Sequence, residues 1–189
     1  YEMQRSLVGS EMCIRDRRHI VGVQFRNLAT VGGSVFGRFG FSDVLTLLLV
    51  MDSYVELYKG GIVPLADFVN MPYDRDILVR VIVKKTAAHY SYKSVRISKT
   101  DFPVLTCAAA LTQDGVQAAV GARPAKAALV KDAEQFSTLP MTAEKAKVFA
   151  EYAAGLLPTE TNPRGSAAYR THLIKVLTAR CLTELGGKA

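Results

Sequence analysis

Three successive strand-like segments restrict the fold of this chain more than any other feature. They are HYSYKSVRIS at residues 89–98, VLTCAAALTQ at 104–113 and VQAAVGARP at 116–124. Asp114 and Gly115 join the last two segments and favour a tight hairpin. Strands that are joined by such short turns run antiparallel. We therefore predict an antiparallel meander in this part of the chain.

Two helices are predicted after the meander. The segment TAEKAKVFAEYAAGLL begins at Thr142, a favoured N-cap residue, and Val148, Tyr152 and Leu156 fall on what we expect to be its apolar face. A last helix is expected at about residues 166–185, before glycines that favour a helix end. Its apolar positions with helical spacing are Tyr169, Leu173, Val176, Leu177 and Leu185. Strands followed by helices favour an α+β fold class.

The part of the chain before residue 84 predicts a second, smaller α+β unit. Ser42 as N-cap and Asp43 in the first turn precede the run VLTLLLVM, which predicts a buried helix that ends near Met51. The segment YVELYKGGIVPL surrounds Gly60 and Gly61 and predicts a hairpin. Two further elements are expected, a helical turn at Asp67 and Phe68 and a strand in ILVRVIVKK at residues 77–85. The glycine-rich stretch TVGGSVFGRFG at residues 30–40 is expected to be a loop.

The composition excludes several classes of protein. With 189 residues, 49% of them hydrophobic and 22% charged, the chain is typical of a globular protein. Its longest apolar run, at residues 44–51, is far shorter than the roughly 20 residues of a membrane span. The three cysteines and three histidines have no metal-ligand spacing, and the cysteines suit a reducing cytoplasm. The net charge of +7 is scattered, which favours an anionic ligand or partner over a nucleic acid.

Residues 6–17 match a sequence of synthetic origin, and the alternative is a natural N-terminal tail. The run SLVGSEMCIRDR at residues 6–17 reads as one frame of a transposase adapter used to prepare sequencing libraries, and residues 7–16 agree with it codon by codon. The chain also does not begin with Met. We therefore expect residues 1–17 to be non-native and exclude them from the fold, and we expect the natural chain to begin further upstream.

The pattern alone gives one candidate for an anion site. Gly32 and Gly33 lie between the hydroxyl residues Thr30 and Ser34, so that several backbone N–H groups could converge on a phosphate. The alternative is an ordinary turn. Asp43 could accept hydrogen bonds from ribose or ribityl hydroxyls, and its alternative role is that of a favourable charge at the start of a helix.

Other residues give no comparable signal. The sequence contains no HExxH, Walker or hydrolase triad motif. Asp101 could be catalytic, but a structural role at the start of a strand is the more favourable interpretation. No catalytic residue and no metal ligand is therefore predicted.

The order of several motifs resembles one known family. The motifs are QFRNLATVGGS, FSDVLTLLLVMDSYVELYKGG, VPLADF and DILVRVIV in the first part, and DFPVLTCAAAL, VGARPAKA and RGSAAYRTHLIKVLTARCL in the second. They resemble the flavin subunit of the molybdenum hydroxylases, the family of xanthine dehydrogenase and carbon monoxide dehydrogenase, over residues 18–185. RFGFSDVL and MPYDRDIL are most similar to the xanthine dehydrogenase FAD subunits of anaerobic gut-type bacteria.

The resemblance implies two domains and a set of cofactor contacts. Residues 18–84 are expected to be the second subdomain of a two-part FAD-binding domain, without its upstream half, and residues 85–189 the C-terminal flavoprotein domain of antiparallel sheet plus helices. The loop implied to hold the pyrophosphate and adenine side of FAD consists of Thr30, Val31, Gly32, Gly33 and Ser34. Further contacts with FAD are implied for Asp43, for Ile20 near the isoalloxazine and for the backbone of Leu78.

The implied activity is that of an oxidoreductase subunit in a heteromeric, cytoplasmic complex. A large subunit with molybdopterin oxidises the substrate, a small subunit carries two-iron clusters, and FAD passes the electrons to NAD or another acceptor. The natural part of this chain has only Cys107 and Cys181, so it cannot hold a four-cysteine cluster itself. The fragment alone is expected to be inactive. The alternative is a subunit-docking module with a degenerate or incomplete flavin site.

Overall fold

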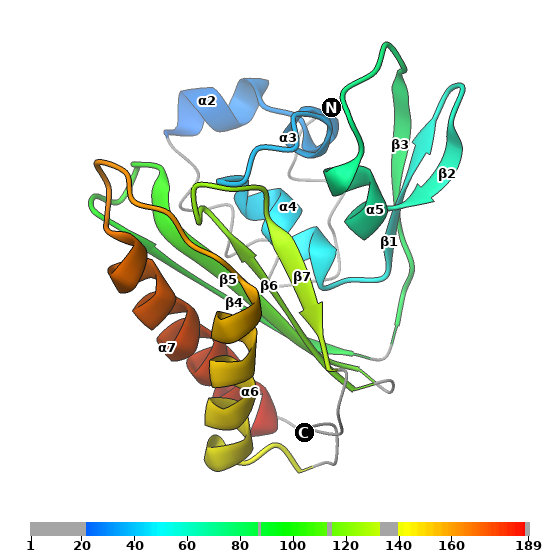
Figure 1. Ribbon diagram of the computed structural model, residues 1–189. Helices are drawn as coiled ribbons and strands as arrows, with labels where there is room; N and C mark the ends of the chain where they lie inside the picture. The colour runs from blue at the N-terminus through cyan, green and yellow to red at the C-terminus, as the bar shows by residue number, and fades with distance from the viewer. Residues whose placement is uncertain (1–21, 87, 113–114, 133–139, 188–189) are drawn as a thin grey trace.

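The computed structural model describes residues 22–86, 88–112, 115–132 and 140–187, which form two antiparallel sheets and their covering helices (Figure 1). Cys13, His19, Ile20 and Asp114 lie outside the described residues. The segment between the sheets runs from the end of β3 at Val83 to the start of β4 at His89.

The first sheet has three strands in the order β2-β1-β3. They are β1 (Ser53–Leu57), β2 (Gly61–Pro64) and β3 (Leu78–Val83), and they confirm the predicted hairpin and the predicted third strand. Gly61 closes the hairpin with a φ of +68°, a conformation that glycine adopts without strain. Helix α5 (Leu65–Asn70) confirms the helical turn after β2. Within the described residues, β2 and β3 each have a strand partner on one side only.

Within residues 22–52, three helices precede this sheet, α2 (Val23–Leu28), α3 (Val31–Phe36) and α4 (Asp43–Leu49). The loop predicted for residues 30–40 is therefore wrong in its first half, because Thr30 caps α3 by accepting a hydrogen bond from the N–H of Gly33. The predicted α4 is confirmed with its cap, since Ser42 accepts from the N–H of Leu45.

The second sheet is a meander in the order β4-β5-β6-β7. Its strands are β4 (His89–Arg96), β5 (Pro103–Thr112), β6 (Gly115–Gly121) and β7 (Ala128–Lys131). The predicted antiparallel meander is confirmed, with Thr112 opposite Gly115 where β5 meets β6. Strand β7 was not predicted, because its four residues are too few to show an alternating pattern.

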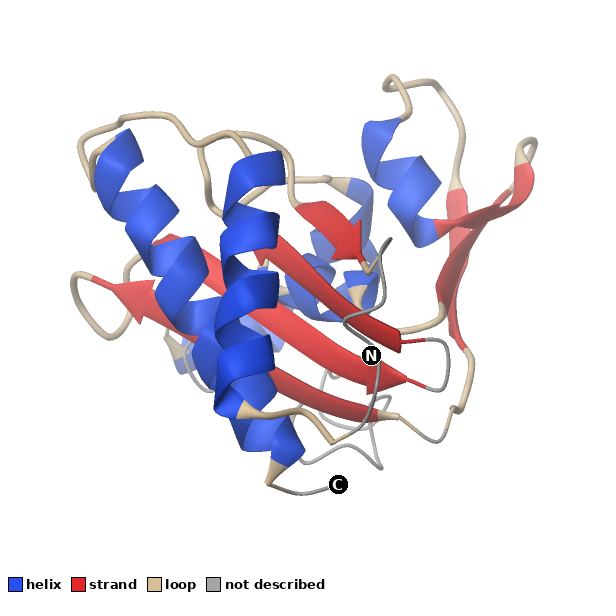
Figure 2. Ribbon diagram, turned by 60° about the horizontal axis from the view of Figure 1, so that its bottom comes forward, coloured by secondary structure: helices blue, strands red, loops and turns tan. Residues whose placement is uncertain are grey.

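Helices cover both faces of the second sheet. Helices α6 (Ala143–Leu156) and α7 (Ala167–Gly186) cover one face and α4 covers the other, as Figures 1 and 2 show. On β5, Leu105 and Cys107 pack in the cluster under α6 and α7, whereas Ala108 and Ala110 pack in the cluster with α4. A strand that is buried on both faces needs no polar alternation, which explains the apolar run in β5.

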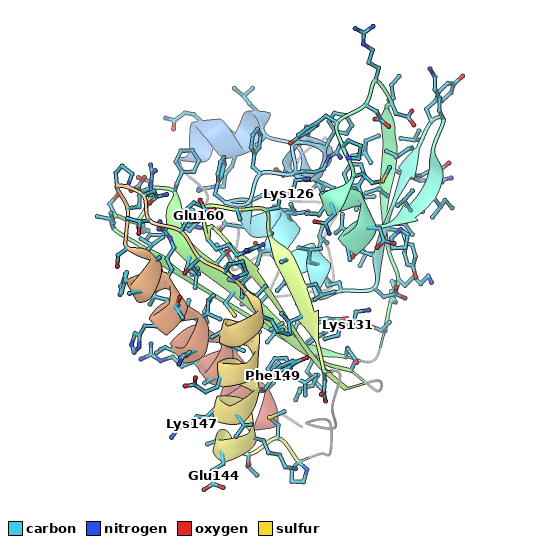
Figure 3. All side chains as sticks on the ribbon, in the orientation of Figure 1. Lys126, Lys131, Glu144, Lys147, Phe149 and Glu160 are labelled. Carbon is cyan, nitrogen blue, oxygen red and sulfur yellow. The ribbon has the colours of Figure 1, made fainter. Side chains whose placement is uncertain are left out.

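The predicted apolar face of α6 is wrong for Val148 and Leu156, whereas Tyr152 is partly buried and packs against the core. Val148 and Leu156 are each 52% exposed. The side chains that pack against the sheet and α7 are those of Ala146, Phe149, Ala150, Ala153 and Ala154. Figure 3 shows Phe149 on the inner side of α6, with Glu144 and Lys147 directed away from the sheet. The inner face is mostly alanine, and these small side chains allow the helix to pack closely on its neighbours. The spacing of the larger residues Val148 and Leu156 therefore indicated the wrong face.

Helix α7 agrees better with its predicted pattern. Its cap residue Ser166 accepts from the N–H of Tyr169, and Leu173, Leu177 and Leu185 are buried. Tyr169 itself is 45% exposed, so its expected place in the apolar face is wrong. It lies in the first turn of the helix.

Candidate functional site

A cavity of about 410 Å³ lies between the start of α3, the start of α4 and the segment that joins β4 to β5. Its lining consists of Ala29, Thr30, Gly33, Ser34, Phe39, Phe41, Ser42, Asp43, Val44, Arg96, Asp101, Phe102 and Pro103. Four of the residues that the sequence singled out, Thr30, Gly33, Ser34 and Asp43, are thus brought together. Its volume falls in the range of roughly 300–1,000 Å³ that is usual for ligand sites.

The other predicted site residues surround this cavity without lining it. Val31 and Gly32 form the first turn of α3, directly after Thr30. A Cβ placed on Gly32 would lie 3.8 Å from Cδ2 of Leu78, so the side chain of Leu78 in β3 lies next to Gly32. Ile20 lies outside the described residues.

We call residues 30–34, TVGGS, the glycine segment. Fewer of its backbone amides are free to bind an anion than the sequence had suggested. The N–H of Gly33 donates to the Thr30 hydroxyl at 3.0 Å, and the N–H of Ser34 donates to the Thr30 carbonyl at 3.1 Å. The amides of Val31 and Gly32 come before this capped pair, where the hydrogen-bond ladder of a helix supplies no acceptor. These two amides are therefore suited to an external acceptor such as a phosphate oxygen.

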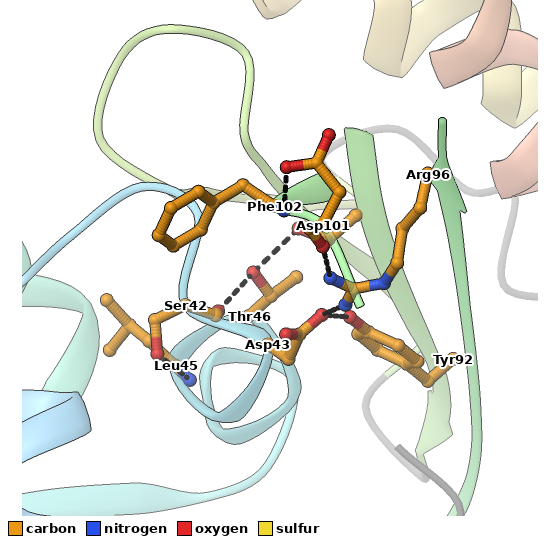
Figure 4. Close-up of polar contacts among 9 residues, drawn as sticks. Ser42, Asp43, Leu45, Thr46, Tyr92, Arg96, Asp101 and Phe102 are labelled. Atoms are coloured by element: carbon orange, nitrogen blue, oxygen red, sulfur yellow. Dashed lines mark hydrogen bonds and ion pairs between the residues drawn. The ribbon is translucent and has the colours of Figure 1, made fainter. Parts of the chain in front are cut away.

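Asp43 lies at the centre of a buried polar network that no sequence pattern predicted (Figure 4). It is only 6% exposed, and its Oδ1 accepts hydrogen bonds from the Tyr92 hydroxyl and the Arg96 guanidinium. Nη1 of Arg96 also donates to the carbonyl of Asp101 at 2.7 Å. Tyr92 and Arg96 are four residues apart on β4 and so share one face of the sheet. An arginine on the same strand face as two tyrosines, in HYSYKSVR, was the available signal.

Three phenylalanines form the aromatic wall of the cavity, and they too were not predicted from the sequence. Phe39 stacks on Phe41 with ring centroids 5.2 Å apart, and Phe41 contacts Phe102 at 4.6 Å. They are 56%, 40% and 46% exposed, respectively. The guanidinium of Arg164 lies 5.3 Å from the Phe102 ring centroid. Exposed rings beside a cavity favour a flat aromatic ligand.

Asp101 lies at the edge of the cavity as a residue that starts a strand. Its Oδ1 accepts from the N–H of Phe102 at 2.7 Å, just before β5 begins at Pro103. Nη2 of Arg164 lies 3.4 Å from the same oxygen. The predicted structural role is confirmed by these contacts.

Arg170 of α7 is hydrogen-bonded to the start of β5. It is fully buried and donates to the carbonyls of Val104 at 3.0 Å and Glu160 at 2.7 Å. Burial, with a smaller contribution from the neighbouring Arg164, lowers the pKa of Arg170 below its ordinary value. Four hydrogen bonds to uncharged oxygens keep the buried guanidinium solvated by the protein.

Elsewhere in the described residues, we find no comparable candidate for a functional site. A larger cavity of about 720 Å³ lies between the two sheets and contains none of the predicted site residues. The described residues hold no group of three or more His, Cys, Asp or Glu side chains that could bind a metal ion. Among them there is also no helix of sufficient length and hydrophobicity to cross a membrane.

Two family models match this chain. Residues 5–86 match the FAD binding domain in molybdopterin dehydrogenase, a match that begins within the segment that we expect to be non-native. Residues 90–185 match the CO dehydrogenase flavoprotein C-terminal domain.

Individual proteins are also similar. The uncharacterized protein YgfM of Escherichia coli (strain K12) is 29% identical over 155 residues, which are 82% of this chain and 57% of YgfM. The chain thus spans little more than half the length of this relative. Two solved structures share the fold over 95% of this chain and 68% of theirs. They are quinoline 2-oxidoreductase from Pseudomonas putida 86, with a TM-score of 0.82 and 22% identity, and carbon monoxide dehydrogenase from Hydrogenophaga pseudoflava, with 0.83 and 18%.

Proposed function

Because the chain belongs to the family of FAD-binding subunits of the molybdenum hydroxylases, we propose that it binds FAD in the cavity beside α3 and α4. The observation that carries this proposal is that Thr30, Gly33 and Ser34 of the TVGGS segment line one cavity together with Asp43. In this proposal residues 18–84 are the second subdomain of the FAD-binding domain. Residues 85–189 are the C-terminal flavoprotein domain.

The residues of the cavity fit a dinucleotide with a flat ring system. The amides of Val31 and Gly32 would donate to the pyrophosphate, and the missing side chain of Gly33 in the cavity lining leaves room for a phosphate to approach. The aromatic wall of Phe39, Phe41 and Phe102 offers faces for stacking. Contacts of Asp43, Ile20 and the Leu78 backbone with FAD remain part of the proposal.

When bound, FAD supplies reversible electron transfer, and the residues of this chain hold and orient it. The proposed role is that of a xanthine dehydrogenase-like electron-transfer subunit. It would take electrons from the iron–sulfur clusters of a small subunit, deliver them to NAD or another acceptor, and pair with a large molybdopterin subunit. Cys107 and Cys181 are free thiols buried in the core, which is consistent with clusters on a partner and with a reducing cytoplasm.

The proposal is tested by titrating the purified chain with FAD and following the quenching of flavin fluorescence. Gly33→Ala should weaken FAD binding at least tenfold, because Gly33 lines the cavity and a methyl group there would reduce the space for a phosphate beside the Thr30 hydroxyl. The thermal midpoint is measured beside FAD affinity, because the new Cβ would lie 3.0 Å from the Thr30 hydroxyl that caps α3, and the loss of affinity should exceed any loss of stability.

Gly155→Ala is the matched control. Gly155 lies in α6, and apart from its chain neighbours and the nearby helix backbone no atom lies within 4 Å of the position that a methyl group would take there, so the change should not affect FAD binding. Failure of the unsubstituted chain to bind FAD would contradict the proposal and favour the subunit-docking alternative.

A further inference from the structure

One guanidinium joins three elements of the cavity wall. Arg96 ends β4, and its side chain is 8% exposed. Its Nη2 is paired with Oδ1 of Asp43, the first residue of α4. Its Nη1 donates to the carbonyl of Asp101 in the segment that leads to Phe102 (Figure 4). A single side chain thus connects α4, β4 and the start of β5.

A second donor from the same strand acts on the same oxygen. The Tyr92 hydroxyl donates to Oδ1 of Asp43, so both donors from β4 converge on one carboxylate oxygen. Two side chains of the second sheet therefore hold this carboxylate of α4 in one orientation. Asp43 therefore has a role in the packing of α4 on β4 that is independent of any ligand.

The start of α4 is linked in turn to the glycine segment. The Ser42 hydroxyl donates to the carbonyl of Ser34 at 3.2 Å, while it also accepts from the N–H of Leu45. Ser34 ends the TVGGS segment in α3. A continuous series of polar contacts therefore runs from Ser34 through the start of α4 to Arg96 and on to Asp101.

We propose that Arg96 is a positioning residue of the flavin site. It sets the spacing between the glycine segment and the aromatic wall without needing to touch the cofactor itself. Lysine cannot replace it, since one ammonium group cannot reproduce the planar fork that reaches both Asp43 and Asp101. This inference depends on the proposed function, because it assigns the fixed spacing to the binding of FAD.

The experiment compares Arg96→Lys with the unsubstituted 189-residue chain and with Arg80→Lys as the control. Arg80 pairs with Glu56 on the exposed face of the first sheet, remote from the cavity lining. Three readouts are measured: FAD affinity by fluorescence, the visible spectrum of bound FAD at saturation, and hydrogen exchange of residues 41–49 and 97–103 in the absence of FAD. Tyr92→Phe serves as a milder second variant, because it removes one donor and leaves the ion pair.

Arg96→Lys should weaken FAD binding at least tenfold, alter the visible spectrum of the bound flavin and speed exchange in both segments. Tyr92→Phe should give a smaller change of the same kind, and Arg80→Lys none. Unchanged affinity, spectrum and exchange in Arg96→Lys, with normal binding by the unsubstituted chain, would overturn the inference and leave the proposed function intact. No binding by the unsubstituted chain would overturn the proposed function and, with it, the flavin role of Arg96.

Discussion

The first region of this molecule consists of α2 to α5 with the first sheet, and the second region consists of the second sheet with α6 and α7. The two regions obtain their hydrophobic cores in different ways. The second sheet with α6 and α7 has a complete core of its own, built around residues such as Phe149 and Ile174. The core of the first region is completed by the other sheet, because the leucines of α4 pack on Ala108, Ala110 and Ala119 of β5 and β6. A boundary that is clear in the sequence near residues 84–88 is therefore absent from the packing. The first region depends on the second far more than the reverse.

The largest effect is expected from Phe149→Ala. The side chain is fully buried under α6, so its removal should lower the free energy of unfolding by about 3–5 kcal/mol. Since the first region packs on the second sheet, both regions should lose structure in one transition. Chemical denaturation monitored by circular dichroism and by hydrogen exchange checks this. Persistence of protected β1 and β3 amides in the variant would contradict the proposed dependence.

Leu45→Ala tests the comparison from the other side. Leu45 of α4 is fully buried in the core of the first region, and its truncation should cost about 2–5 kcal/mol. Here we expect faster hydrogen exchange in β1, β3 and α5, while β5 and α7 keep their protection. Equal loss of protection in both regions would show that the second sheet needs α4 as much as α4 needs the sheet.

Gly121→Ala probes the contact surface between the regions. A Cβ at this position would lie 2.4 Å from the hydroxyl of Thr46 and 2.5 Å from both the Gly40 carbonyl and the Thr106 hydroxyl. The resulting overpacking should cost about 1–3 kcal/mol and weaken the Thr46–Thr106 hydrogen bond of 3.0 Å. Thermal unfolding measures the loss, with the open position Gly155→Ala as the control. A thermal midpoint equal to that of the control would mean that the regions can separate at little cost.

The smallest effect concerns Asp76, at the far end of the first sheet. Desolvation, the largest single contribution, raises its pKa, but the hydrogen bonds from the amides of Lys59, Ile77 and Gly60 and the charge of Lys59 together outweigh it and hold the pKa below the ordinary value of 3.8. A lowered pKa in the folded state means that the contribution to stability is present above the ordinary value and is lost as the pH falls through the folded value. Asp76→Asn should therefore lower the thermal midpoint slightly at neutral pH and not at all at strongly acidic pH. A difference that persists in acid would exclude the charge as its cause.

Local chemistry made much of this fold predictable. Ser42, Thr142 and Ser166 each cap the helix that the sequence placed after them, because a cap depends only on residues within one turn. The helix α3 was not predictable in the same way, since two consecutive glycines favour a turn and the helix is stabilised by the cap at Thr30 and by burial of Val35 in the core.

The candidate site was predictable only in part. The glycine segment is contiguous in the sequence, so its residues could be named together. Arg96 meets Asp43 across 53 residues, and Phe102 meets Phe41 only after the two regions have packed. Such contacts depend on the relative placement of α4 and β4, which no short sequence pattern encodes.

Within the described residues, the first sheet has two open edges, β2 and β3, which favour aggregation. Along β2 and β3 and just before β3, Ile62, Ile77 and Val79 are more than half exposed beside unpaired backbone groups. Such edges are templates on which further chains can add strands and so aggregate. Charged side chains on an edge strand oppose this, and here they are Arg80 within β3 and Lys84 directly after it. Arg80 and Lys84 are therefore expected to matter more for keeping this edge from pairing with other chains than for the stability of the fold.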